Sequence, residues 1–130
     1  MNLGEYTDEL LYSYKCPNNK GRLTDADISA FEENATCGDA IMVYLKIHKN
    51  KITDVKFDGA GCVISLGAAD MVADYIKGKD IDEIYHVDKG SMLGIINLDP
   101  GPARIRCMSL FLRATKNAIL EYKVIQKVNK

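Results

Sequence analysis

Residues 40–58, AIMVYLKIHKNKITDVKFD, decide the fold. Aliphatic side chains occupy every second position of the first half, which is the period of a strand with one buried face: Ile41, Val43, Leu45 and Ile47. A turn at residues 49–50 leads to a return segment that places three side chains on one face: Thr53, Val55 and Phe57. The sequence therefore predicts an antiparallel hairpin with strands over residues 40–48 and 51–58.

Helical segments are predicted on both sides of this hairpin. They run over residues 5–15, from a cap at Ser65 to Gly78, over residues 80–87 and over residues 106–124. Residues 25–33 lack strong periodicity and are expected to be mobile. Residues 89–102 are predicted to be chiefly loop, because they hold three glycines and two prolines.

The composition fits one ordinary protein core. A chain of 130 residues with 47% hydrophobic side chains is expected to form a single domain over residues 1–130. It holds no apolar run of about 18 residues, and its first residues lack the basic-then-apolar pattern of a secretory signal. We therefore expect a soluble cytoplasmic protein whose four cysteines stay reduced.

Charge is distributed unevenly along the chain. Residues 101–130 carry seven basic side chains and one acidic, although the whole chain has a net charge of -1. Such a segment can attract an acidic protein or a nucleic acid, but no aromatic residues are interleaved for base stacking. A solvated basic helix face is the preferred interpretation, and neither nucleic acid nor membrane is an expected partner.

Two cysteines and one aspartate are expected to meet at the open end of the hairpin, and a third cysteine joins them if the final helix packs alongside. Cys37 and Asp39 precede its first strand, Cys62 follows its second, and Cys107 opens the final helix, where the helix dipole favours a thiolate. Thiolates suit zinc and iron-sulfur clusters, and a harder oxygen ligand suits a site that must fill and empty. Without a CxxC pair, however, the spacing alone favours scattered structural cysteines over a metal or cluster site.

Four segments favour the metal or cluster site over scattered structural cysteines: CPNNKG at residues 16–21, ATCGDAI at 35–41, FDGAGCVIS at 57–65 and PARIRC at 102–107. In order and spacing they resemble the IscU/NifU/SufU family of iron-sulfur cluster assembly scaffolds, over nearly the whole chain. The resemblance implies an α+β fold of the SufE/NifU-like kind, in which a small antiparallel sheet of about three strands packs against several helices. It also implies that Cys37, Asp39, Cys62 and Cys107 form one ligand set.

The same resemblance implies a function. Family members receive sulfur from a cysteine desulfurase of the IscS, SufS or NifS type, assemble a transient two-iron two-sulfur cluster and pass it to apo iron-sulfur proteins. Cys37 is then the candidate persulfide acceptor, and a monomer or weak dimer is expected. The primary hypothesis is a scaffold without enzymatic activity. The alternatives are a zinc-dependent, SufU-like sulfurtransferase and a module in which zinc only holds loops together.

This chain departs from the family pattern at several places. Arg106 stands where IscU-type members have a histidine, and an arginine cannot lose its proton to bind a metal. Arg106 is instead expected to compensate thiolate charge, to help lower the pKa of Cys107, or to lie solvated at the surface. Residues 100–104 replace the LPPVK segment of chaperone recognition, and the insertion that SufU members carry before the last cysteine is absent. Cys16 is an additional thiol outside the ligand set.

Overall fold

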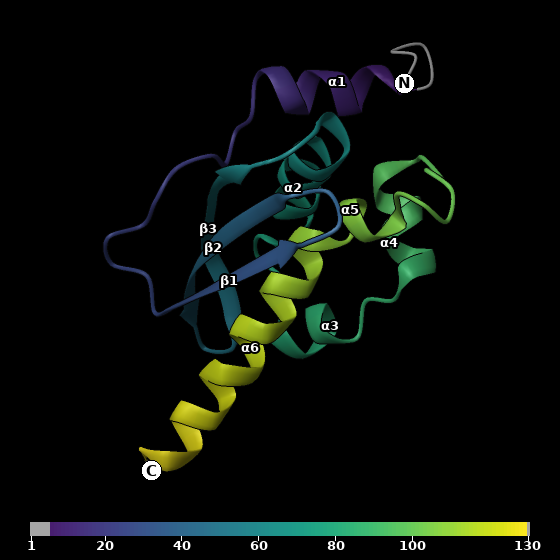
Figure 1. Ribbon diagram of the computed structural model, residues 1–130. Coiled ribbons are helices and arrows are strands. Elements are labelled where there is room, and N and C mark those ends of the chain that lie inside the picture. The colour runs from purple at the N-terminus through teal and green to yellow at the C-terminus, as the bar shows by residue number, and fades with distance from the viewer. Residues whose placement is uncertain (1–5, 130) are drawn as a thin grey trace.

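The computed structural model describes residues 6–129, which form three strands and six helices (Figure 1). The strands are β1 (Ile28–Asn34), β2 (Asp39–His48) and β3 (Lys51–Ala60). The helices are α1 (Asp8–Lys15), α2 (Val63–Ile76), α3 (Ile81–Tyr85), α4 (Lys89–Ile96), α5 (Ile105–Met108) and α6 (Leu110–Val128). The α+β class is confirmed.

The predicted hairpin is confirmed as β2 and β3, which pair antiparallel around the turn at Lys49 and Asn50. Ile41, Val43, Leu45 and Ile47 are all buried. The predicted buried face of the return strand is wrong at one position. The register shifts after Lys46, so that Ile52 pairs with Ile47 and is buried, while Thr53 is exposed. A β-bulge explains this, because one extra residue reverses the faces on either side of it.

A third strand, β1, forms where the sequence showed no strong periodicity. It pairs antiparallel with β2 from Ile28 opposite Leu45 to Asn34 opposite Asp39, and it is the edge of a sheet with the order β1-β2-β3. Its two ends, Ile28 and Asn34, are the buried positions, whereas Phe31 in the middle is exposed. Backbone pairing with β2 and contact with α6 therefore hold this strand.

The helices pack on the sheet and complete the core. Helix α6 contacts β1 and β2, while α2 contacts β3 and lies against α1, α4, α5 and α6. In Figure 1, α1 lies over one end of the molecule and the last turns of α6 extend beyond the sheet at the other end. Phe57 of β3 meets Phe111 of α6 edge to face, with ring centroids 5.9 Å apart, so the aromatic contact joins the sheet to the long helix.

Several predicted helix boundaries are corrected. Helix α2 begins at Val63 with Cys62 as its N-cap residue, so Ser65 lies inside the helix instead of capping it. Residues 89–96 form helix α4 rather than loop, because Asp88 caps it by accepting a hydrogen bond from the Ser91 backbone. The final helix is divided by Ser109 into α5 and α6.

The first helix starts later than predicted, since Thr7 caps it and Asp8 is its first residue. The predicted start at Glu5 lies outside the described residues. Within residues 6–129, no helix has the length and apolar character needed to cross a bilayer.

Candidate metal centre

Three separate elements bring the candidate ligands together. Cys37 lies in the turn between β1 and β2, and Asp39 is the first residue of β2. The Asn34 carbonyl accepts hydrogen bonds from the backbone N–H groups of Cys37 (3.2 Å) and Gly38 (2.8 Å), and Gly38 closes the turn with a φ of 76°. Cys62 caps α2, and Cys107 lies on α5.

The distances among these side chains are short. The Cys37 and Cys107 Sγ atoms lie 3.0 Å apart, and both Cys37 Sγ (3.7 Å) and Cys62 Sγ (3.6 Å) contact the Asp39 carboxylate at Oδ2. Ligand atoms of Cys37, Asp39 and Cys107 all lie within 4.8 Å of one another. The structure thus gathers all four candidate residues, with Asp39 between the two exposed thiols.

Burial divides the site into a floor and a mouth. Cys107 and Asp39 are only 7% and 5% exposed, whereas Cys37 and Cys62 are exposed to solvent. All four line a cavity of about 360 Å³. A group bound on the floor therefore stays within reach of a partner molecule through the two thiols at the mouth.

Other residues, which the sequence analysis did not assign to the site, lie in it or beside it. The Asn34 side-chain amide donates to Cys107 Sγ at 3.5 Å, and the Ser65 hydroxyl lies 3.6 Å from Cys62 Sγ. Arg104 also lines the cavity, and its guanidinium donates to the Tyr6 hydroxyl at 3.4 Å. Two features of the sequence could have identified them: Ser65 lies in the GCVIS segment, and Asn34 lies three residues before Cys37.

The expectation of an activated thiolate at Cys107 is wrong. Burial, together with the neighbouring Cys37, Asp39 and Cys62, raises the pKa of Cys107 to about 12. The position of Cys107 on the short helix α5 does not offset these effects. Three thiols and a carboxylate crowded together repel one another when ionised, so a cation between them is what would stabilise their charged forms.

The donor set fits a thiophilic metal. A sulfur and a carboxylate oxygen held by one zinc ion, about 2.3 Å and about 2.1 Å from it, lie about 3.6 Å apart in tetrahedral geometry. The contacts of Cys37 Sγ and Cys62 Sγ with Asp39 Oδ2, at 3.7 and 3.6 Å, match that spacing. The 3.0 Å contact between the Cys37 and Cys107 Sγ atoms is shorter than the spacing of about 3.8 Å that two sulfurs on one zinc ion take. Cys37, Asp39, Cys62 and Cys107 therefore suit zinc or the iron of a cluster.

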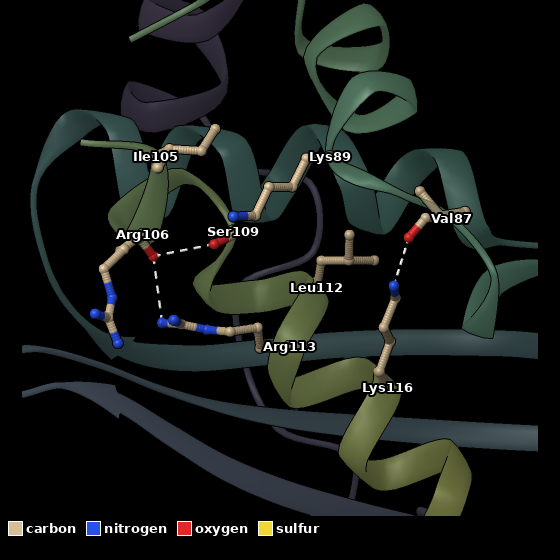
Figure 2. A pocket seen from close by; sticks show the side chains of 8 residues that line it. All are labelled: Val87, Lys89, Ile105, Arg106, Ser109, Leu112, Arg113 and Lys116. Carbon is tan, nitrogen blue, oxygen red and sulfur yellow. Dashed lines mark hydrogen bonds between the residues drawn. The ribbon is translucent and has the colours of Figure 1, made fainter. Parts of the chain in front are cut away.

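Arg106 lies exposed at the rim of this cavity and also lines a second one (Figure 2). Its backbone oxygen accepts hydrogen bonds from the Ser109 hydroxyl and from the Arg113 guanidinium, each at 3.3 Å. Of the expected roles for Arg106, an exposed position at the surface agrees with the structure.

The fourth cysteine and the two histidines lie away from the cavity. Cys16 is an exposed thiol at the C-terminal end of α1 and does not line the site. His48 is exposed at the end of β2, and His86 ends α3 with its Nδ1 atom 2.7 Å from the Asp82 carbonyl. Neither histidine is among the residues that line the cavity.

Comparison with known proteins gives consistent matches along the chain. The model of the NifU-like N terminal domain family matches residues 5–129. The zinc-dependent sulfurtransferase SufU of Bacillus subtilis is 33% identical over 131 residues, which covers 88% of each chain. The iron-sulfur cluster assembly scaffold protein IscU of Thermotoga maritima is 28% identical over 130 residues, covering 88% of this chain and 92% of that protein.

Two solved structures share the fold. One comes from Fervidobacterium islandicum and is described as an iron-sulfur cluster assembly scaffold for the SUF system. It superposes with a TM-score of 0.78 at 22% identity, covering 92% of this chain and 99% of that one. The other, a NifU-like N-terminal protein from Brucella abortus, has a TM-score of 0.76 at 17% identity, covering 92% and 95%.

Proposed function

Because the chain belongs to the family of NifU-like N-terminal domains, we propose that it is a scaffold on which an iron-sulfur cluster is assembled before transfer to other proteins. The cluster is the cargo of such a scaffold rather than its resident cofactor. One observation carries the proposal: Cys37, Cys62 and Cys107 meet around Asp39, with two thiols at the surface.

The division between floor and mouth supports assembly followed by release. Asp39 supplies oxygen among sulfurs, and a carboxylate is a harder ligand than a thiolate for the iron of a cluster. A site of this composition holds its cargo less firmly than four thiolates would. The exposed thiols leave room for an acceptor cysteine to approach, and apo iron-sulfur proteins are the proposed recipients.

Cys37 is the proposed sulfur acceptor, because it is exposed and lies in a turn rather than inside a helix or strand. Its thiolate attacks the outer sulfur of a persulfide carried by a cysteine desulfurase. The new S–S bond forms on Cys37 while the bond on the desulfurase breaks, and the desulfurase cysteine leaves as a thiolate, so no external oxidant or reductant is needed. The reduced thiols of this site suit the cytoplasm, where we propose that the protein acts.

The scaffold proposal is tested by anaerobic reconstitution with ferrous iron, cysteine and a cysteine desulfurase. The expected result is a visible-absorbing cluster that leaves the protein when an apo-ferredoxin is added. The Cys16→Ser variant is a matched control, because this thiol lies outside the cavity. Absence of any cluster in the wild-type protein would contradict the proposal.

A second candidate function is zinc-dependent sulfur transfer, in which the chain accepts sulfur without building a cluster. The similarity to the Bacillus subtilis sulfurtransferase and the arginine in place of a histidine at position 106 favour it. Zinc held by the site would stabilise its ligands as thiolates and leave Cys37 to exchange sulfur.

Desulfurase turnover measured with the zinc-loaded protein separates the two functions. Sulfur transfer predicts that the zinc form accelerates turnover and that the Cys37→Ser variant does not. A scaffold without this activity leaves the rate unchanged but still forms the cluster. Zinc content of the freshly purified protein, measured by elemental analysis, identifies the ion that occupies the site after expression.

A further inference from the structure

A second cavity of about 350 Å³ lies beside the metal centre, between α5, α6 and the turn that joins α3 to α4 (Figure 2). Half of its eight lining residues are cationic: Lys89, Arg106, Arg113 and Lys116. The others are Val87, Ile105, Ser109 and Leu112, so none of the described residues that line it is acidic. Four positive charges around one cavity create a strong local attraction for anions.

These charges are not neutralised by ion pairs within residues 6–129. The basic residues in salt bridges there lie elsewhere: Arg22, Lys46, Lys77 and Lys123. The neighbouring carboxylate is Asp88, which caps α4 by accepting the Ser91 N–H at 2.7 Å. This hydrogen bond, with a smaller contribution from Lys116, lowers the pKa of Asp88, so Asp88 offsets part of the charge of one cation. The basic C-terminal segment, expected from its sequence to be a solvated face, thus contributes three of its cations to a concave site.

The cationic groups are held in place and retain unused donors. The Lys116 ammonium donates to the Val87 carbonyl, and the Arg113 guanidinium donates through one Nη atom to the Arg106 carbonyl. A lysine ammonium has three N–H groups, so two remain. The Nε atom of Arg113 is buried without a hydrogen-bond partner, which is uncommon in folded proteins.

We propose that this cavity binds a small organic anion that carries two or more carboxylates. Several fixed cations favour a multiply charged ligand, and the side chains of Val87, Ile105 and Leu112 can pack against its carbon skeleton. Since Arg106 lines both cavities, the bound anion lies next to the metal centre. The inference does not depend on cluster assembly, and its test does not use that activity.

Citrate is a suitable probe, titrated at low ionic strength while backbone amide signals are followed by NMR. Saturable shifts are expected at Lys89, Ser109 and Lys116. The variants Lys89→Gln and Lys116→Gln should each weaken binding about tenfold. Lys127→Gln is the matched control, because this lysine lies on the same helix as Lys116 but outside the cavity, and it should bind citrate as the wild type does.

Carboxylates can come from a free metabolite or from acidic side chains of a protein, so a tetraglutamate peptide is titrated in parallel. Tighter binding of citrate supports a free anion as the ligand, whereas tighter binding of the peptide contradicts it and identifies an acidic protein segment instead. In both cases the effect must be lost in Lys89→Gln, whose side chain is exposed and whose removal leaves the core intact. If neither probe gives saturable shifts at the cavity, or Lys127→Gln weakens binding equally, the proposal is overturned.

Discussion

The Sγ atoms of Cys37 and Cys107 lie 3.0 Å apart, although 70 residues separate them in the chain. Cys37 belongs to the turn that joins two strands, and Cys107 belongs to a short helix before α6. Their contact therefore depends on the packing of the C-terminal helices on the sheet. A change in the packing of these helices would therefore change the distance between the two sulfurs.

Substitution of the three clustered cysteines should remove metal. Cys37→Ser, Cys62→Ser and Cys107→Ser are each expected to lower bound zinc or iron from one site to nearly none, because serine is a poor ligand for soft metals. Elemental analysis after dialysis measures this. Cys16→Ser should retain the full amount, and an equal loss in that variant would refute the assignment.

Asp39 should determine how long the cargo stays. The variant Asp39→Cys replaces a hard oxygen with a fourth sulfur, so the cluster should decay and transfer more slowly than in the wild type. The loss of visible absorbance in the presence of a chelator reports the lifetime. Asp39→Ala should keep the fold and also change the lifetime, and unchanged decay in both variants would remove Asp39 from the site.

Metal affinity should rise with pH. The pKa of Cys107 is raised to about 12, so at neutral pH this thiol keeps its proton until a metal displaces it. Each proton released on binding increases the apparent affinity about tenfold per pH unit, and acidification reverses the gain. Competition between the protein and a zinc chelator, from about pH 6 to about pH 8, measures the slope.

A direct count of protons provides the control for this slope. Zinc added to weakly buffered protein should release at least one proton per ion at neutral pH, and Cys16→Ser should give the same value. An affinity that does not vary with pH would show that the thiols are already ionised in the metal-free protein.

Sequence alone predicted the parts of the fold that carry a one-sided hydrophobic pattern. Strand β2 alternates buried Ile41 and Val43 with partly exposed neighbours, and that period identifies it. Strand β1 has no such pattern, because its outward face carries Phe31 while pairing with β2 and contact with α6 hold it in place. Helix α4 was predicted to be loop because Gly90 and Gly94 disfavour a helix, and the Asp88 cap offsets their effect.

The candidate site was predictable only where it depends on the predicted hairpin. The hairpin explains why Cys37 and Cys62 lie near each other, since both flank its open end. The sequence could place Cys107 there only on the condition that its helix packs alongside the hairpin, and the family resemblance supplied that condition, because its place depends on how α5 packs against α2. Its raised pKa follows from burial and neighbouring charges, which a linear sequence does not contain.

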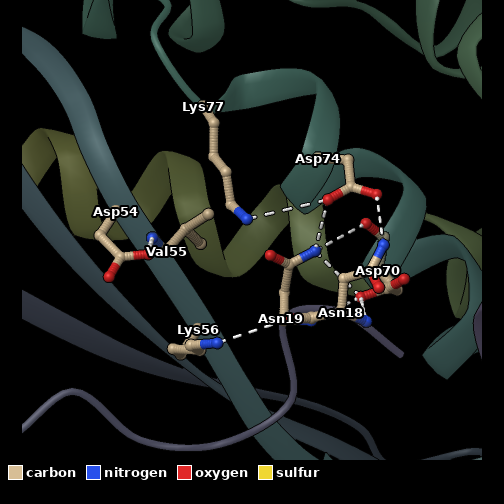
Figure 3. A network of polar contacts seen from close by, with 8 residues as sticks. All are labelled: Asn18, Asn19, Asp54, Val55, Lys56, Asp70, Asp74 and Lys77. Carbon is tan, nitrogen blue, oxygen red and sulfur yellow. Dashed lines mark hydrogen bonds and ion pairs between the residues drawn. The ribbon is translucent and has the colours of Figure 1, made fainter. Parts of the chain in front are cut away.

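Asp70 should stabilise the segment that joins α1 to the sheet. Its Oδ1 atom accepts hydrogen bonds from the backbone N–H groups of Asn18 and Asn19, both at 2.9 Å, and from the Asn19 side chain at 3.0 Å (Figure 3). Asp70→Ala leaves these buried donors without an acceptor, so the free energy of unfolding should fall by about 3 kcal/mol. Urea unfolding measures this change.

The Asp70→Asn variant separates the hydrogen bonds from the charge. Burial raises the pKa of Asp70, with a smaller contribution from Asp74 in the same direction, so the folded protein binds its proton more tightly than the unfolded chain does. This contribution to stability is present below the unfolded pKa and is lost as pH rises through the folded pKa. Asp70→Asn keeps an acceptor oxygen and should abolish that decline, whereas an unchanged pH profile would contradict the assignment.

Gly59 should be essential for the register that places Asp39 beside Cys62. Its φ is 154°, and a Cβ atom there would lie 2.2 Å from the Ala40 carbonyl oxygen and 2.9 Å from the Ile41 Cα. Gly59→Ala must therefore separate β2 from β3, with an expected loss of about 3 kcal/mol in unfolding free energy and weaker zinc binding.

Gly90→Ala is the matched control, because its Cβ would have no neighbour closer than 3.5 Å and alanine favours a helix, so stability should change by less than about 1 kcal/mol. Equal stability of the two variants in urea would show that the sheet tolerates a side chain at position 59.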